Sequence, residues 1–233
     1  EVFLRTALGA ELLANAAALR QSLGDRYSRY AESDNPEIVT HVRAAGAADY
    51  VFVVNDRREA GTYVGQHGLV LDAGLPSKGT IALSRKNVHV YDLTARREVT
   101  ATTSDGATRW PIVLGPCDGN VFLVTDRPIA EVLIESPSAV SLGQSLACQV
   151  AVTDVSQAPI NAVIPVRVDV TDPHGRPAEF SGYYGAADGK LSLKLDIAIN
   201  DTPGVWTIRV HELASGRSAT RYVRVRPATP DAG

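Results

Sequence analysis

The sequence predicts an all-β protein of two tandem antiparallel β-sandwiches, the second immunoglobulin-like, with one short N-terminal helix. Apolar and β-branched residues gather in short segments that recur about every ten residues, and turn residues separate them. This spacing is typical of sandwiches and not of helical or nucleotide-binding folds. The segments of the first sandwich are 38–46, 50–56, 79–85, 88–96, 100–110, which is expected to form a hairpin around Asp105-Gly106, and 120–126.

The N-terminal part predicts one amphipathic helix that ends near Gly24. Its apolar positions recur at helical spacing, and no second helix is expected to pair with it. We expect its apolar stripe to pack on the first sandwich; the alternative is that it is the last helix of a preceding domain. The residues of the stripe are Leu8, Leu12, Ala16, Leu19 and Leu23.

The second half of the chain repeats the strand pattern after Arg127-Pro128. About seven strands fall in roughly 100 residues, the number found in immunoglobulin-like domains. Trp206 lies in one of them and is expected in the core. The expected domains are a helical segment at 1–35, a first sandwich at 36–128, a second at 129–227 and a tail at 228–233. The strand segments are 129–137, 146–154, 164–172, 191–198, 205–213 and 219–227.

Composition describes a globular protein and excludes some partners. The chain is 45% hydrophobic and 21% charged, and its net charge of −3 offers no basic face for nucleic acid or an anionic membrane. No apolar stretch reaches the roughly 18 residues of a membrane helix. Because the chain begins with Glu1 and has no Met, we expect a processed chain or a fragment. Cys148 is expected as a buried free thiol, unpaired with Cys117.

The first sandwich resembles the small β-sandwich that follows the catalytic barrel in multidomain bacterial glycoside hydrolases of the β-galactosidase type. The resemblance lies in DYVFVVND (49–56), VYDLTARREVTATTSDG (90–106) and GNVFLVTD (119–126). These motifs are structural. The resemblance implies a non-catalytic accessory region of a carbohydrate-active enzyme, whose partner is the catalytic domain of the same polypeptide, with its catalytic carboxylates upstream of Glu1.

The second sandwich resembles the macroglobulin-type or fibronectin-like sandwiches of large exported bacterial proteins. The segment 170–216 carries the resemblance, with an Asp-Pro-x-Gly turn and the sequence NDTPGVW (200–206). Such a fold performs many roles and implies adhesion, spacing or docking but no reaction. Together the two resemblances imply an extracellular or periplasmic location.

No catalytic constellation stands out in the sequence. Glycosidases use two carboxyl groups on either side of the scissile bond, but the candidate pairs, Asp92 with Glu98 and Asp169 with Asp196, read as solvated side chains. The five histidines show no metal-ligand spacing, and no Gly-x-Ser-x-Gly motif occurs. We therefore expect no catalysis, no metal and no cofactor, and we rank a hydrolase last. Calcium at Asp172, Asp188 or Asp201 is an alternative to ordinary turn capping.

The candidate binding residues are aromatic. Tyr183 and Tyr184 lie among small residues and could stack on a sugar ring, which would make the chain a carbohydrate-binding module. The alternative is an edge strand in which one tyrosine faces the core and the other the surface. Tyr63 and His67, with Gln66, lie in a polar segment, 57–68, that is expected to be a long functional loop.

Overall fold

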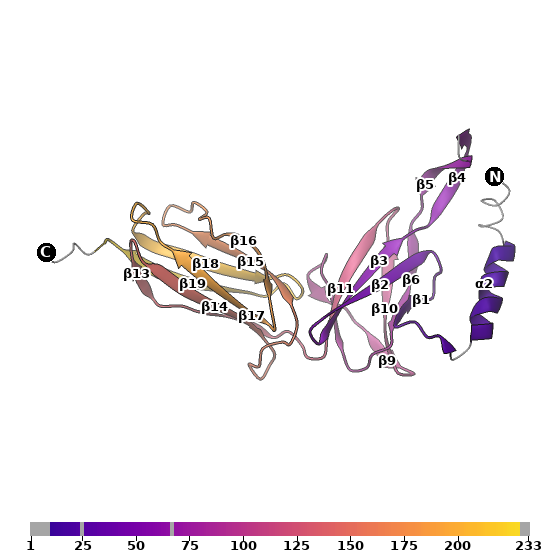
Figure 1. Cartoon of the computed structure of the whole chain (residues 1–233), viewed down its shortest axis with the longest axis horizontal. Coiled ribbons are helices and arrows are strands. Elements are labelled where there is room, and N and C mark those ends of the chain that lie inside the picture. The colour runs from indigo at the N-terminus through magenta and orange to yellow at the C-terminus, as the bar shows by residue number, and fades with distance from the viewer. Residues whose placement is uncertain (1–9, 24–25, 66–67, 229–233) are drawn as a thin grey trace. The chain divides into compact units, whose positions relative to one another are not determined.

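The computed structural model describes residues 10–23, 26–65 and 68–228. These residues are mostly strand, with the helix α2 (Ala10–Leu23) before the first sheet, which confirms the predicted all-β class and sandwich architecture (Figure 1). The strands that precede residue 129 are β1 (Ala31–Ser33), β2 (Ile38–Ala45), β3 (Ala48–Asn55), β4 (Arg58–Gly65), β5 (Gly68–Gly74), β6 (Ser77–Leu83), β7 (His89–Asp92), β8 (Arg97–Glu98), β9 (Thr102–Ser104), β10 (Ala107–Leu114) and β11 (Gly119–Thr125). Those that follow are β12 (Glu131–Glu135), β13 (Ala139–Ser141), β14 (Ser145–Thr153), β15 (Ile164–Thr171), β16 (Gly182–Ala186), β17 (Lys190–Asp196), β18 (Gly204–Glu212) and β19 (Ser218–Arg226).

The described residues form two compact units. The predicted domain limits at 35, 128 and 227 stay a prediction, because the units follow spatial contact and not the order of the chain. The first unit lies within Glu1–Val42, Val51–Lys86 and Ala101–Asn120, and the second within Arg43–Tyr50, Asn87–Thr100 and Val121–Gly233.

The first unit contains a four-stranded antiparallel sheet of order β1-β6-β10-β9. Strand β10 alternates, so that Trp110 and its neighbours two residues away are buried, and Trp110 pairs with Ile81. The hairpin between β9 and β10 confirms the predicted turn. Asp105 and Gly106 have φ angles of 49° and 83°, as a two-residue type I′ turn requires. A five-stranded sheet has the order β2-β3-β11-β7-β8, and its strands β7 and β8 lie within the second unit.

The prediction of a long polar loop at 57–68 is wrong. Residues 58–65 and 68–74 pair as the antiparallel hairpin β4–β5, which extends away from the other strands of its unit (Figure 1). Thr62, Tyr63 and Val64 favour strand, and the glycines that suggested a loop accompany register shifts at Glu59/Ala60 and Ala60/Val64. Glycine within a strand commonly marks such a bulge.

The predicted packing of the helix is not found for its described side chains. Residues 14–19 and 21–23 of α2 are exposed, including Leu19 and Leu23 of the expected stripe. The predicted helix is therefore confirmed, but the predicted burial of its apolar stripe is not. Among the described residues no helix is long and apolar enough to span a membrane.

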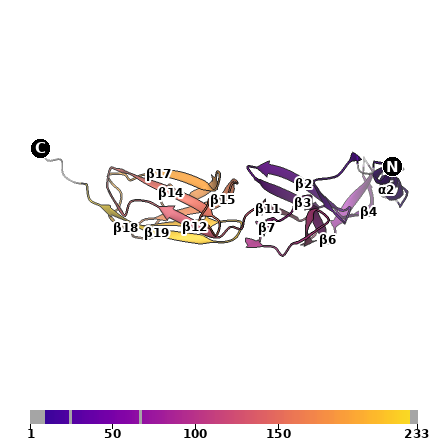
Figure 2. The ribbon, with the colours of Figure 1, turned by 90° about the horizontal axis from the view of Figure 1, so that it is seen from below.

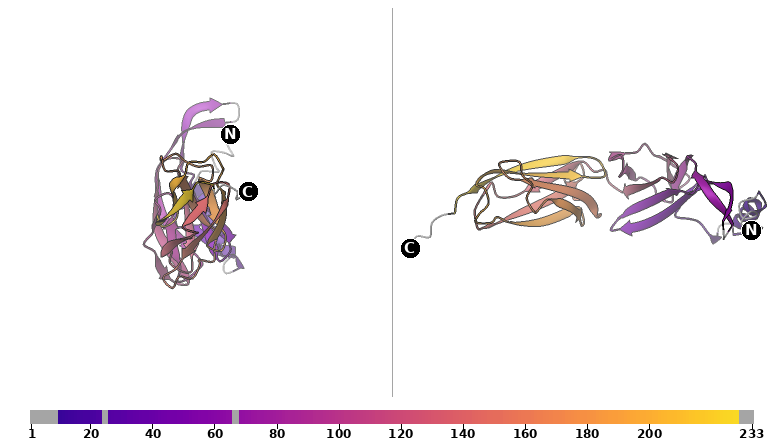
Figure 3. Two further views of the ribbon diagram at one scale, coloured as in Figure 1. Left: turned by 90° about the vertical axis from the view of Figure 1, so that its left-hand side faces the viewer. Right: turned by 90° about the horizontal axis from the view of Figure 1, so that it is seen from above.

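The second unit contains a sandwich of two sheets. One has the order β12-β14-β17 and the other β13-β19-β18-β15-β16, in which β13 pairs parallel with β19. Figure 2 shows the two layers edge-on, with β14 and β17 in one and β18 and β19 in the other, and the right panel of Figure 3 shows them from the opposite side. The predicted strands of this half are confirmed. The short strands β13 and β16 add to them.

Alternating valines, isoleucines and leucines from both sheets fill the core of this sandwich. Trp206 is 5% exposed and packs there, as predicted, and its indole Nε1 donates a hydrogen bond to the Thr202 carbonyl at 2.9 Å. Cys148 is buried on β14, Cys117 is exposed, and both thiols are free, as predicted.

Candidate functional site

The candidate site is the solvent-facing side of the sheet that contains β15, β16, β18 and β19. Side chains alternate along each strand, so the valines of β15 and the residues Trp206, Ile208 and Val210 of β18 enter the core while their neighbours point outward. We call this surface the outer face. Its residues are Arg167, Asp169, Thr171, Tyr183, Thr207, Arg209, His211, Thr220, Tyr222, Arg224 and Arg226.

One tyrosine of the outer face lies beside an arginine. Tyr183 is on the edge strand β16, is 70% exposed, and pairs in register with Arg167. The guanidinium carbon of Arg167 lies 6.0 Å from the centroid of the Tyr183 ring, near the limit for a cation–π contact. The ring of Tyr183 is therefore carried on a paired strand, and most of its surface is exposed to solvent.

Asp169 is the one carboxylate of the outer face. It accepts hydrogen bonds from Arg167 Nε and Nη2 at 3.0 and 2.8 Å, and its other oxygen lies 3.7 Å from His211 Nε2. In the ladder it stands opposite Arg209. Asp169 raises the pKa of Arg167, with Tyr183 as a second cause. The carboxylate thus fixes the guanidinium beside the tyrosine ring.

A shallow hollow of about 420 Å³ lies at the centre of the outer face. Carboxylate, hydroxyl, guanidinium and imidazole groups line it, all carried on the two adjacent strands β15 and β18. Such an arrangement offers several hydrogen-bond donors and acceptors to a polar ligand, on a backbone with little freedom to move. The lining residues are Asp169, Thr171, Thr207, Arg209 and His211.

The predicted binding residues do not come together. Tyr184 points opposite to Tyr183: its ring packs against the core, and its hydroxyl donates to the Phe180 carbonyl at 2.8 Å. This is the edge-strand alternative considered from the sequence. Tyr63 lies on β4, where its side chain is not described, and His67 lies outside the described residues. Of the four, only Tyr183 is placed on the outer face.

Sequence reasoning considered Asp169 only as a solvated carboxylate and missed the other polar residues of this face. The signal was present in VRVDVT (166–171) and WTIRVHE (206–212), where charged residues occupy alternate positions of two buried strands. Each such charge reads singly as a solvated side chain. Only the register, which pairs Arg167 with His211 and Asp169 with Arg209, shows that the charges gather.

The candidate catalytic pairs are engaged in local contacts. Asp92 Oδ1 accepts hydrogen bonds from the amides of Thr94 and Ala95, and Glu98 pairs with His89 Nδ1 at 2.7 Å. Asp169 and Asp196 lie on strands of different sheets. Asp196 pairs with Lys194 at 2.8 Å, and hydrogen bonds from Lys194 and then Ser145 lower its pKa.

The turn aspartates considered for calcium lie in separate turns. Asp172 accepts from the amides of His174 and Arg176, and Asp201 accepts from the amide of Ala198 at 2.7 Å. Asp188 adopts a positive φ of 50° in a third turn. Across the part of the chain that the structure describes, no group of three or more histidine, cysteine or acidic residues could hold a metal ion.

Glu212 is the most deeply buried acidic residue among those described, with an exposed fraction of zero. Its carboxylate accepts hydrogen bonds from the Ala214 amide at 2.5 Å, the Ser215 amide at 2.7 Å and the Ser215 hydroxyl. Burial raises the pKa of Glu212, while the hydrogen bonds from Ser215 and Ala214 act in the opposite sense. These contacts shape the turn after β18 and leave the carboxylate facing inward.

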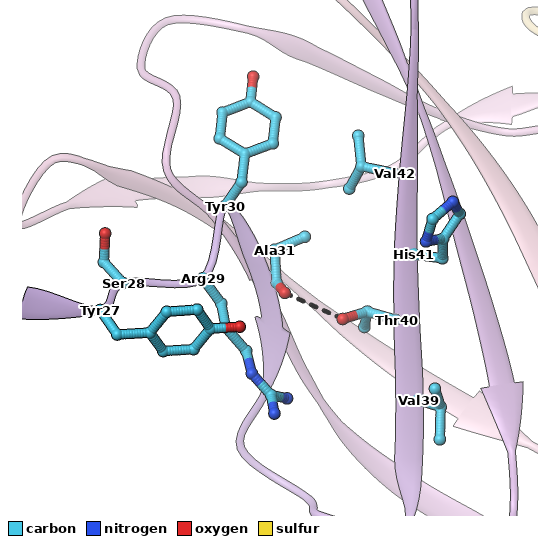
Figure 4. A pocket seen from close by; sticks show the side chains of 9 residues that line it. All are labelled: Tyr27, Ser28, Arg29, Tyr30, Ala31, Val39, Thr40, His41 and Val42. Carbon is cyan, nitrogen blue, oxygen red and sulfur yellow. Dashed lines mark hydrogen bonds between the residues drawn. The ribbon is translucent and has the colours of Figure 1, made fainter. Parts of the chain in front are cut away.

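A second hollow, of about 440 Å³, lies in the first unit between the segment at residues 27–31 and strand β2 (Figure 4). Thr40 faces Ala31 and donates a hydrogen bond to its carbonyl at 3.0 Å, whereas Val39 and His41 lie on the opposite side of β2. Tyr27 and Tyr30 also point in different directions. Because its polar groups diverge, this hollow is the weaker candidate.

Comparison with known proteins identifies no family. No family profile matches the chain, and no curated protein matches its sequence. Solved structures are similar only distantly. A superoxide reductase from Ignicoccus hospitalis is 15% identical, with a TM-score of 0.31 over 42% of this chain and 82% of that one.

A β-glucosidase from Listeria innocua is 19% identical, with a TM-score of 0.30 over 41% of this chain and 16% of that one. The adhesin InvE of Yersinia pseudotuberculosis is 13% identical, with a TM-score of 0.34 over 86% of this chain and 62% of that one. Similarity at this level identifies no parent protein.

Proposed function

We propose that this chain is a non-catalytic accessory region of a larger carbohydrate-active protein, and that its outer face contacts polysaccharide. The observation that carries the proposal is Tyr183, an exposed ring on a rigid strand, next to Arg167 and the polar hollow. An aromatic ring can stack on the apolar face of a sugar, and the adjacent guanidinium, imidazole and hydroxyl groups suit its hydroxyl groups.

The contacts of the candidate carboxylates support a binding role over a catalytic one. A glycosidase needs one carboxyl group held protonated and a second facing it across the scissile bond. On the outer face the single carboxylate, Asp169, accepts hydrogen bonds from Arg167, and its candidate partner Asp196 lies on the other sheet of the sandwich. We therefore expect no turnover of chromogenic glycosides or esters by the purified chain.

The binding test compares two exposed tyrosines. Tyr183→Ala should weaken the affinity for a soluble polysaccharide by roughly three- to tenfold, as expected for an aromatic contact worth about 0.5–1.5 kcal/mol. Tyr27→Ala is the matched control, since Tyr27 is 60% exposed and lies in the other unit. Titration calorimetry measures both variants, and their melting temperatures should stay unchanged.

Two outcomes would contradict this assignment. Loss of binding in Tyr27→Ala alone would move the site to the hollow of the first unit. Turnover abolished by a single Asp, Glu or Ser substitution would make the chain an enzyme.

The remaining part of the proposal concerns the parent protein. We propose that the chain supports or orients a catalytic domain of the same polypeptide and acts outside the cytoplasm, in the extracellular space or the periplasm. The encoded sequence upstream of Glu1 is the test. A (β/α)-barrel pattern with paired carboxylates at strand ends supports the proposal, and an upstream sequence without such a barrel contradicts the supporting role.

A further inference from the structure

The outer face carries positive charge although the chain is acidic. The whole chain has a net charge of −3, whereas the outer face holds four arginines against one carboxylate with His211 counted as neutral. Arg167 and Arg209 come from β15 and β18, and Arg224 and Arg226 follow Tyr222 along β19 at alternate, exposed positions. The net surplus of three positive charges is therefore local to this sheet.

Much of that charge is available to a ligand. Asp169 engages Arg167. The guanidinium of Arg209 makes only a long contact, 3.4 Å from Nε to the Thr220 hydroxyl. For Arg224 and Arg226 no side-chain hydrogen bond or ion pair joins them to other described residues. Arginine pairs with carboxylates through two parallel hydrogen bonds, so free guanidinium groups on a strand favour an acidic ligand.

The register places these arginines around a second exposed tyrosine. Tyr222 is 64% exposed and pairs with Thr207. Arg224 lies two residues further along the same strand, and Arg209 lies on the diagonal across β18, at separations of about 7 Å in ideal sheet geometry. Tyr183 on the edge strand β16 forms a similar pair with Arg167 on the adjacent strand β15. The outer face thus carries two tyrosine–arginine pairs.

The two pairs lie far enough apart for a chain of sugars. Tyr183 and Tyr222 are three strands apart and four residues apart in register, which corresponds to roughly 20 Å on a flat sheet. The threonine hydroxyls, His211 and the central hollow occupy the space between them. A tyrosine ring for stacking occurs at both ends, and Arg209 and Arg224, which no described carboxylate engages, lie at the Tyr222 end.

We infer that the ligand of the outer face is an anionic polysaccharide whose sugar units carry carboxylate groups. This inference rests on the proposed function and names its substrate class. Tyr183 and Tyr222 stack on sugar rings, while Arg209 and Arg224 bind the carboxylates. A neutral polysaccharide would leave the guanidinium groups unused, and an acidic polypeptide would lack the sugar rings on which the tyrosines stack.

The test uses polygalacturonate and the same polymer after full methyl esterification, because esterification removes the charge and keeps the sugar backbone. Calorimetry should show binding of polygalacturonate at least about tenfold tighter than of the ester, with an affinity that falls as salt screens the charges. Arg209→Gln/Arg224→Gln should weaken binding of polygalacturonate by roughly three- to tenfold per arginine and leave binding of the ester unchanged.

The matched control is Arg26→Gln/Arg43→Gln. It removes two exposed arginines outside the outer face, Arg26 in the segment before β1 and Arg43 on β2. It changes the net charge equally and should leave affinity unchanged. Equal loss in this control would show a general charge effect and overturn the inference. Poly-L-glutamate bound as tightly as polygalacturonate would also overturn it, because sugar rings would then contribute nothing.

The outcomes separate the inference from the proposed function. Equal binding of the acidic and esterified polymers, with loss in Tyr183→Ala, refutes the acidic ligand and retains a polysaccharide-binding face. Binding of neither polymer, nor of any neutral polysaccharide, refutes both. Melting curves of each variant confirm that the arginine substitutions leave the fold intact, as expected for exposed side chains.

Discussion

Replacing Trp206 tests the core of the second sandwich, which holds the outer face in position. Trp206 is 5% exposed, and burying an aromatic side chain of about 200 Å² contributes on the order of 5 kcal/mol at 25 cal/mol per Å². Trp206→Ala also leaves a cavity. Substitutions of this kind cost about 3–5 kcal/mol in free energy of unfolding.

The intermediate variant Trp206→Phe divides this cost into two parts. Phenylalanine keeps most of the apolar contact but loses the hydrogen bond from Nε1 to the Thr202 carbonyl. We expect a loss of about 1 kcal/mol for the hydrogen bond, with the remaining 2–4 kcal/mol appearing only in Trp206→Ala. Tyr222→Ala is the control on the adjacent strand and should change stability by less than about 0.5 kcal/mol.

Urea unfolding measures these differences by far-ultraviolet circular dichroism. In Trp206→Phe and Trp206→Ala the remaining tryptophan is Trp110, which lies buried in the first unit, so tryptophan fluorescence reports that unit separately. The transition of Trp110 should have the same midpoint in both variants. A loss below about 1 kcal/mol in Trp206→Ala would refute the core role, since a buried indole cannot be removed at so small a cost.

Three further predictions concern other positions. Burial raises the pKa of Glu212 in the folded protein, so its contribution to stability is complete below the unfolded pKa of about 4.3 and is lost as the pH rises through the folded pKa. Glu212→Gln should therefore abolish that part of the fall in the free energy of unfolding, measured with urea, between acid and neutral pH. An unchanged dependence of this free energy on pH would contradict the prediction. Gly189→Ala should lower the free energy of unfolding by roughly 2–4 kcal/mol, and Gly175→Ala by only about 1 kcal/mol. Both glycines have a positive φ, but an added Cβ would lie 2.6 Å from a backbone oxygen at Gly189 and would meet nothing within 4 Å at Gly175. Equal melting temperatures of the two variants would refute the role of this close approach. A thiol reagent should modify Cys117 at once and Cys148 only on unfolding, because Cys148 is buried and burial raises its pKa; rapid modification of two thiols in the native protein would contradict this.

The strands of the second sandwich could be predicted because their alternation is strict. Along β15, and from Trp206 to Val210 of β18, every second residue is apolar and β-branched or aromatic, and the structure buries those residues. The hairpin at Asp105-Gly106 could be predicted from its turn residues alone. The hairpin β4–β5 could not, because its glycines resemble loop residues and its pairing contains register shifts. Exposure of α2 was also missed, since periodicity indicates a face but not its partner.

The candidate site depends on pairing between distant residues, which explains why sequence reasoning recovered only Tyr183. Arg167 and His211 are far apart in the chain and become neighbours because β15 pairs with β18 in one register. A slip of one residue would turn Arg167 and Asp169 into the core, where an unpaired charge is costly, and would bring valines to the surface. The buried valines of β15 and Trp206 of β18 therefore fix the register, and the register in turn assembles the charges. This links stability to binding: the core substitution Trp206→Phe should leave the outer face and its affinity intact as long as the sandwich stays folded, whereas Arg209→Gln should reduce affinity without changing stability.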